Sequence, residues 1–174
     1  MEKESYLKQL ALRVLAGFAV LLGHNLIYGI IAVFTLHFSY FFFSIFVPSA
    51  LIGNKIATLT TTFEFIPACV AVSAYILLAL LVFLTKGISW NERLQMIVYG
   101  WLAILAFNLL RIEILLLTFF SLETAYDTLH LFVWKFMSTV FVVLLWLGLA
   151  RLYKVKAIPV FSDIKALAGM IRKK

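Results

Sequence analysis

Four long apolar stretches, separated by short polar segments, constrain this chain more than any other feature of its sequence. A helix needs about 20 apolar residues to cross the hydrocarbon core of a bilayer. Of the 174 residues, 64% are hydrophobic and 13% are charged, whereas about 25% of the residues in a soluble domain are charged. The sequence therefore predicts an all-α integral membrane protein with a single membrane domain over residues 1–174, a bundle of four or five transmembrane helices.

The expected spans lie at about residues 12–36, 66–84, 94–116 and 129–150. The first apolar stretch is too long for one straight span, so its aromatic end from His37 onward is expected at the outer interface, as part of an outer segment over residues 37–65. A five-span alternative turns the chain near Gly23 or Gly29. In the outer segment, threonines and the Gly53-Asn54 pair favour a small β-hairpin over an irregular loop.

Basic residues give the expected orientation. They precede the first stretch, flank the link at residues 85–91 and fill the tail at residues 151–174, whereas the other two connections hold only Lys55. By the positive-inside rule, both termini are cytoplasmic in a multi-pass cell-membrane protein. The tail carries most of the net charge of +7 directly after a span. We therefore expect it to contact anionic lipid, and we expect no nucleic acid partner. After Pro159 the apolar spacing suits a short interfacial helix, and a frayed basic tail is an equally open alternative.

Cys69, Arg111 and His130 lie on three successive apolar stretches at a similar expected depth. At about 1.5 Å of rise per residue, they lie about 26, 27 and 32 Å from the basic residue that marks the inner end of each stretch. The hydrocarbon core is about 30 Å thick, so all three are expected near the outer face. Ionisable groups at membrane depth are costly and indicate a functional site by default.

These three residue types together support acyl transfer through a thioester. A thiolate is a strong nucleophile and is favoured by a nearby cation. Arg111 supplies a fixed positive charge, and His130 can move protons near neutral pH. Each also has a structural interpretation: packing for the cysteine, headgroup contact or pairing with a glutamate for the arginine, and an interfacial position for the histidine. Their common depth favours a shared site.

Other polar residues surround this trio. Asn108 shares a helical face with Arg111 and could orient the guanidinium or bind a substrate carbonyl. Glu64 precedes Cys69 and opposes the thiolate unless it pairs with Arg111 or Lys55. Pro67 suits a first helical turn, which would place Cys69 near a helix N-terminus. His24 and Asn25 are expected to form interhelical hydrogen bonds, and Lys135 to pair with a carboxylate or face a polar cleft.

Several chemistries are excluded by the sequence. A single cysteine rules out an internal disulfide and a multi-cysteine metal site. No serine-hydrolase, zinc-protease or phosphate-binding loop motif is present. We therefore expect neither a metal nor a cofactor.

The order of these residues resembles the exosortase/archaeosortase family of multispan membrane cysteine transpeptidases. The matches are Pro67-Ala68-Cys69 at the start of one span, Asn108-x-x-Arg111 on the next and His130 on the one after. The family usually has Ala-Cys-Ser/Thr-Gly at the first position and often a small residue after the histidine. Here Val70, Ala71 and Trp134 depart from that pattern.

The resemblance implies a function. Cys69 would attack a membrane-anchored secreted protein at a C-terminal sorting signal, which comprises a short motif, a transmembrane helix and a basic cluster. Arg111 would polarise the carbonyl or donate a proton, and His130 would act as base. The acyl group would pass to an amine, a lipid or water.

Two alternatives stay open at this point. The first is a non-catalytic membrane module, such as a transporter subunit or an assembly scaffold, in which the polar residues are structural. The second is a thiol acyltransferase that acts on lipid.

Overall fold

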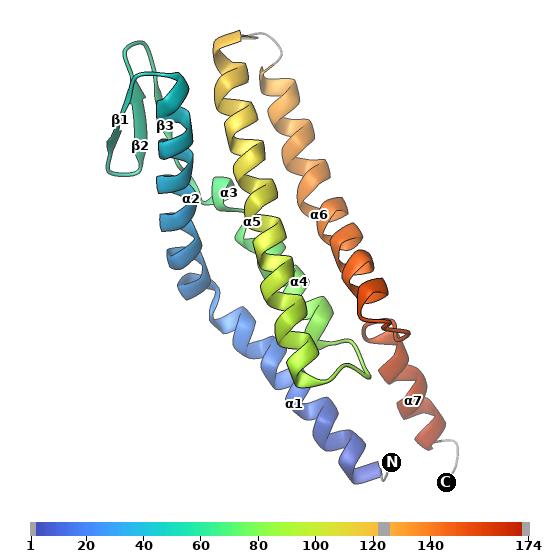
Figure 1. Cartoon of the computed structure of the whole chain (residues 1–174). Coiled ribbons are helices and arrows are strands. Elements are labelled where there is room, and N and C mark those ends of the chain that lie inside the picture. Colours follow the sequence, from blue (N-terminus) through green and yellow to red (C-terminus); the bar gives the residue numbers. More distant parts are fainter. Residues whose placement is uncertain (1–2, 122–125, 172–174) are drawn as a thin grey trace.

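The computed structural model is a helical bundle with a small sheet at one end (Figure 1). It describes helices and strands over residues 3–121 and 126–171, and side chains over residues 4–119 and 139–170. The elements are α1 (Lys3–Leu22), α2 (His24–Phe46), β1 (Ser49–Ile52), β2 (Lys55–Thr58), β3 (Thr62–Glu64), α3 (Pro67–Val70), α4 (Val72–Phe83), α5 (Trp90–Ser121), α6 (Tyr126–Leu152) and α7 (Phe161–Ile171).

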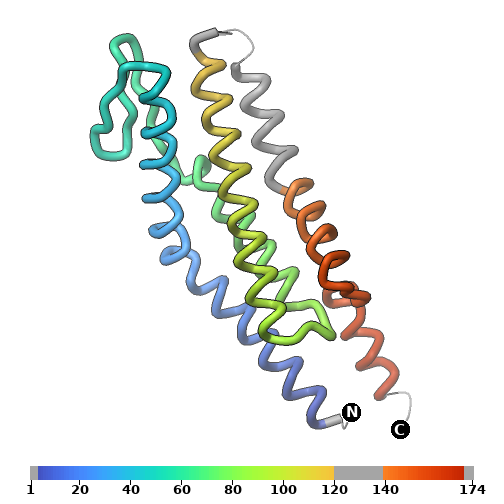
Figure 2. Tube along the Cα trace, viewed as in Figure 1, coloured from blue at the N-terminus to red at the C-terminus, as the bar shows by residue number. Residues whose placement is uncertain are grey.

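The first apolar stretch forms two helices that bend at Gly23 and do not fold back on one another. Gly23 has φ −76° and ψ 5°, and the tube in Figure 2 continues from α1 into α2 away from the N-terminus. The expected separate interfacial piece after residue 36 is wrong, because α2 stays helical through Phe46. No proline interrupts the chain before Pro48, and the residue before a proline is pushed out of the helical conformation. Val47 accordingly is extended, with φ −132° and ψ 122°.

Helix α4 is the centre of the bundle and contacts α1, α2, α5 and α6. Leu78, Ala79 and Val82 on this helix are fully buried. Gly100 on α5 faces Leu78 and Leu149, so that α4, α5 and α6 approach one another closely at this point. Small residues permit such close contacts between membrane helices.

The sheet confirms the expected hairpin and adds a third strand. Its order is β1-β2-β3, antiparallel throughout, with Ile52 paired to Lys55 across the Gly53-Asn54 turn. Gly53 has φ +62°, the left-handed conformation that suits the first central position of a type II′ turn. Ile56 of β2 is fully buried against Phe43 of α2 and against Ile112 and Leu116 of α5. The sheet therefore covers the C-terminal parts of α2 and α5.

Three polar residues fix the connection between α4 and α5. Ser89 and Glu92 form a capping box at the start of α5: the Ser89 backbone N–H and hydroxyl donate to the Glu92 carboxylate, and the Glu92 N–H donates to Ser89 Oγ. Arg93 is 2% exposed and donates to the carbonyls of Val82, Phe83 and Thr85 at the end of α4. Its guanidinium therefore caps a helix C-terminus and is not a free interfacial charge.

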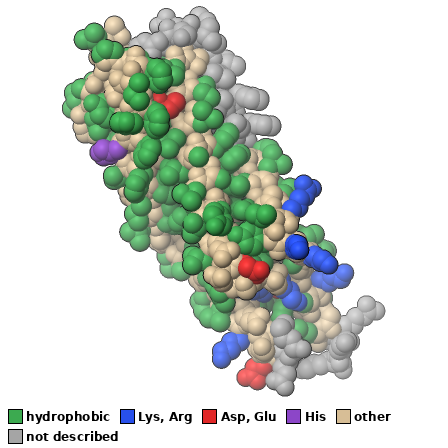
Figure 3. Space-filling view, viewed as in Figure 1, with side chains coloured by type: hydrophobic (Ala, Val, Ile, Leu, Met, Phe, Trp, Pro, Cys, Tyr) green, Lys and Arg blue, Asp and Glu red, His purple; other side chains and the backbone are tan. Residues whose placement is uncertain are grey.

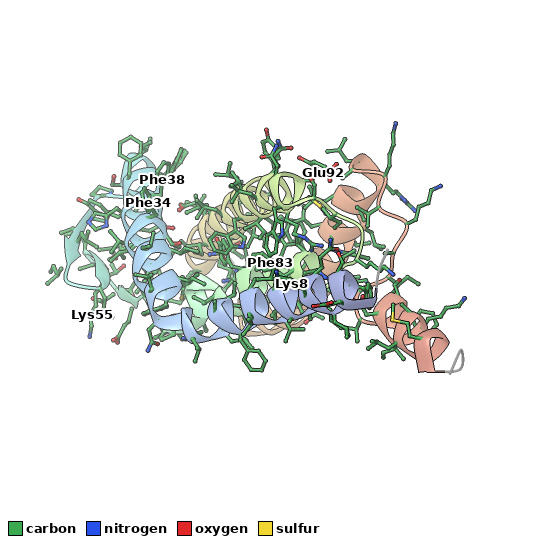
Figure 4. The ribbon with its side chains drawn as sticks, turned by 90° about the horizontal axis from the view of Figure 1, so that it is seen from below. Lys8, Phe34, Phe38, Lys55, Phe83 and Glu92 are labelled. Atoms are coloured by element: carbon green, nitrogen blue, oxygen red, sulfur yellow. The ribbon has the colours of Figure 1, made fainter. Side chains whose placement is uncertain are left out.

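The outer surface of the helices is apolar, as expected for a membrane-embedded protein. Among the described residues, three helical segments are long and apolar enough to cross a membrane: Glu4–Leu22, His24–Phe46 and Trp90–Phe119. Hydrophobic side chains cover the middle of the space-filling view, and charged side chains gather toward the end that holds both termini (Figures 1 and 3). Phe34 and Phe38 project outward from α2 (Figure 4) and are 56% and 46% exposed.

The expected C-terminal helix is present and is tied to the start of the chain. Asp163 at the beginning of α7 accepts two hydrogen bonds from Arg13, at 2.9 and 2.8 Å, and one from Tyr6 at 2.5 Å. All three residues are at most 6% exposed. Burial alone would raise the pKa of Asp163, but the hydrogen bonds from Arg13 and Tyr6 outweigh it and hold the pKa below its ordinary value of 3.8.

Candidate active site

The segment that carries Cys69 is a single helical turn followed by a break. Pro67 occupies the first turn of α3 as expected, and the Cys69 N–H donates to the carbonyl of Ile66 at 2.9 Å. The expected continuous helix over residues 66–84 is wrong, because Ala71 adopts φ 55° and ψ 37° and separates α3 from α4. This left-handed conformation is unfavourable for residues that carry a Cβ. The break leaves carbonyl groups at the end of α3 without helical partners.

Asn108 and Arg111 on α5 bind these carbonyl groups. Asn108 Nδ2 donates to the Cys69 carbonyl at 2.8 Å. Arg111 Nη2 lies 3.3 Å from the same oxygen and 3.5 Å from the Ala68 carbonyl. Asn108 is 3% exposed and Arg111 is 9% exposed, so both side chains are held inside the bundle. The structure thus brings together three of the residues that sequence analysis selected.

Cys69 and Arg111 line one side of a cleft of about 240 Å³. Strand β3 and the residue after it also line this cleft through Phe63, Glu64 and Phe65, as do Leu115 and Leu116 of α5. The thiol is half-buried and unoxidised. The sequence predicts the hairpin but does not predict that β3 lines this cleft. The only sequence feature that could have indicated it is the position of β3 immediately before Pro67.

The charges around the thiol depart from one expectation, the helix dipole, and agree with another, the pairing of Glu64 with Lys55. Helix α3 has only four residues, so its dipole is weak and we assign it no stabilisation of a thiolate. Glu64 pairs with Lys55 at 3.4 Å rather than with Arg111, which reduces its opposition to a negative sulfur. Within the described part of the chain, Arg111 Nε is buried and has no hydrogen-bond partner. The guanidinium is therefore the cation available to the thiol, and one of its donors is free.

A second cleft, of about 420 Å³, lies on the other side of α3. It is lined by His24, Asn25 and Tyr28 of α2 and again by Arg111. The expected interhelical hydrogen bonds of His24 and Asn25 are wrong: the His24 ring nitrogen lies 3.1 Å from the Asn25 side-chain oxygen on the same helix, and both residues are exposed. His24 and Asn25 are therefore exposed polar side chains of α2 that line the same cleft as Arg111.

The remaining predicted residues lie outside the described side chains. His130 belongs to α6, but its side chain is not among those described, and the same is true of Trp134 and Lys135. Glu123 lies between the two described ranges. Over the described residues, no group of three or more His, Cys, Asp or Glu side chains is arranged to hold a metal ion.

Comparisons with known proteins add no relative. No protein-family model matches the chain, and neither a curated protein nor a solved structure matches it.

Proposed function

We propose that this chain is a multi-pass membrane cysteine transpeptidase or protease that uses Cys69 as its nucleophile. One observation carries the proposal: the only thiol of the chain and the buried guanidinium of Arg111 line the same cleft. A cation fixed next to a sulfur favours the thiolate. A guanidinium that lines the same cleft can also donate to the oxygen of a tetrahedral intermediate.

The proposed arrangement in the membrane has four passes. The bent α1–α2 pair, α4 with α3, α5 and α6 each cross once, with both termini cytoplasmic and the sheet outside. The concentration of basic residues at the end with the termini supports this orientation. Cys69 then lies near the outer face, where the cleft opens below the sheet.

The proposed reaction proceeds in two steps. The Cys69 sulfur forms a bond to the substrate carbonyl carbon, and the C–N bond of the scissile peptide then breaks. Arg111 stabilises the negative oxygen, and the thiol proton passes to the departing amine, through His130 according to the resemblance. An acceptor amine, a lipid or water then attacks the thioester and returns a proton to the sulfur.

The proposed substrates are membrane-anchored secreted proteins with a C-terminal sorting signal. The resemblance supplies this substrate class. A cleft near the outer end of a membrane helix bundle suits a peptide that is held there by its own transmembrane segment. The apolar wall formed by Phe63, Phe65 and Leu116 would contact side chains of the signal motif.

The test compares Cys69→Ala and Cys69→Ser in cells that carry the native substrates, with C-terminal peptides measured by mass spectrometry. Cys69→Ser keeps size and polarity but removes most nucleophilicity, so both variants should lose processing while the protein still inserts. Arg111→Gln should lower the rate by about 100–1000-fold, as the loss of one oxyanion donor does. Processing that persists in Cys69→Ala would overturn the proposal.

A non-catalytic membrane module is the second candidate, and the contacts of Asn108 and Arg111 favour it. Both side chains satisfy carbonyl groups at the α3–α4 break, which is a sufficient structural role. In this case Cys69→Ser is silent in cells. Intact-mass detection of an acyl adduct on Cys69 would exclude this candidate, and the adduct mass would separate a peptide substrate from a fatty acyl group.

A further inference from the structure

A pocket of about 390 Å³ lies at the end of the bundle that holds both termini, remote in sequence from Cys69. It lies between the α4–α5 connection and the segment that follows α6, and three lysines from these two segments line it. We call it the lysine pocket; its lining residues are Lys86, Gly87, Ile88, Glu92, Tyr153, Lys154, Val155, Lys156 and Ala157.

The described residues balance the positive charge of the lysine pocket only in part. Ion pairs within the described part of the chain join Arg13 to Asp163 and Lys55 to Glu64, so none involves these three lysines. Glu92 also lines the pocket, and its hydrogen bonds from Ser89 leave its negative charge in place, so the three lysines and Glu92 together carry a net charge of +2 (3 − 1). Lys86 lies 4.5 Å above the ring of Tyr6 and is also attracted by Asp163, whose charge is already balanced by Arg13.

The backbone after α6 holds two of the lysines in fixed positions. The Val155 N–H donates to the Ala150 carbonyl at 2.8 Å, and Lys154 has φ 53°. This is the pattern of a Schellman motif, whose left-handed residue is usually glycine. A lysine there is conformationally unfavourable. An unfavourable residue at such a position is a reason to look for a functional role of its side chain.

The lysine pocket is at the level expected for lipid headgroups. Its residues come immediately after the apolar helices α4 and α6 and immediately before the apolar part of α5. Trp90 at this boundary is 51% exposed and packs against Phe83 and Arg93, as interfacial tryptophans do. Leu152, directly before the pocket, is 72% exposed and would contact acyl chains. Basic side chains gather at this end in Figure 3.

We propose that the lysine pocket binds the phosphate headgroup of an anionic phospholipid. Lys86, Lys154 and Lys156 would surround the phosphate, and the half-buried ring and hydroxyl of Tyr153 would form the floor. The sequence predicts lipid contact for the basic tail as a whole. The pocket is instead a defined site, in which lysines of the segment after α6 lie with Lys86 of the α4–α5 connection. Lipid binding there does not depend on any chemistry of Cys69.

The test measures lipid binding to the purified full-length protein by native mass spectrometry, with phosphatidylglycerol, phosphatidylcholine and inorganic phosphate as separate ligands. Phosphatidylglycerol should bind, and phosphatidylcholine should not compete. A lysine near a membrane surface contributes about a fivefold effect on affinity. Lys154→Asn, which keeps a residue tolerant of the left-handed conformation, and Lys156→Gln should each lower phosphatidylglycerol affinity by about that factor.

Lys165→Gln provides the matched control, because Lys165 is an exposed lysine of α7 that does not line the pocket. It should leave phosphatidylglycerol affinity unchanged. An equal loss in Lys165→Gln would mean diffuse electrostatic attraction by the tail and would overturn the proposal. Binding of phosphate alone, with no preference for phosphatidylglycerol, would also overturn it, as would unchanged binding in the two pocket variants.

Discussion

The buried contact between Asp163 and Arg13 gives the sharpest prediction about stability. Replacing Asp163 with Asn removes the negative charge but keeps the size of the side chain. Arg13, at 5% exposure, would then be a buried cation without its bidentate partner. Breaking a buried ion pair from one side costs about 3–5 kcal/mol. We expect the free energy of unfolding to fall by about 3 kcal/mol, near the low end of this range, because the Asn oxygen can still accept one hydrogen bond.

The assay is thermal unfolding in detergent, together with trypsin digestion of the tail after α6. Asp163→Asn should lower the unfolding temperature and speed cleavage between α6 and α7. Arg13→Met combined with Asp163→Leu should restore much of the loss, because no unpaired charge remains. A variant Asp163→Asn that unfolds and digests like the unaltered protein would refute the assignment of α7 to the start of α1.

The same contact predicts a direction of pH dependence. Hydrogen bonds from Arg13 and Tyr6 outweigh burial and hold the pKa of Asp163 below 3.8. The unfolded chain therefore takes up a proton at a higher pH than the folded chain does. The stabilisation is fully present above the unfolded pKa and disappears as the pH falls through the lower folded pKa. Acidification should therefore release α7 from the start of α1, and Asp163→Asn should abolish this pH-dependent release.

Three further variants test other parts of the fold by thermal unfolding. Ala71→Gly should raise stability by about 1 kcal/mol, because it relieves a left-handed residue; a loss would show that the Ala71 methyl group matters more. Gly100→Val should lower stability by about 1–3 kcal/mol, because its Cβ meets Leu78, and an unchanged transition would contradict that close packing. Arg93→Gln should cost about 3 kcal/mol, since three carbonyls lose a charged donor; full stability would disprove its capping role.

Much of this structure follows from local sequence signals. The hairpin at Gly53-Asn54, the helical turn begun by Pro67 and the short helix after Pro159 each depend on a residue whose backbone preference is strong. The apolar lengths likewise give the membrane-embedded helices. These features need no information about neighbouring elements.

Features that depend on packing between elements could not be predicted. The capping role of Arg93 requires the end of α4 to lie beside α5, and sequence alone identifies Arg93 only as an interfacial charge. The path of the first apolar stretch was equally undetermined, because a glycine permits a bend, a turn or a continuous helix. Here α1 packs on α4 and α2 packs on α5, and these contacts select the bend at Gly23.

The break at Ala71 gives a physical reason for the residue pattern that first drew attention to Cys69. A left-handed residue two positions after the cysteine ends α3 and frees the carbonyls of Ala68 and Cys69. Asn108 and Arg111 then bind these carbonyls, which holds the cysteine backbone against α5. Glycine adopts this conformation without strain, so Ala71→Gly should keep the contacts of Asn108 and Arg111 with these carbonyls. Ala71 maintains the break at a conformational cost, and we therefore expect this substitution to change stability more than it changes the geometry around the thiol.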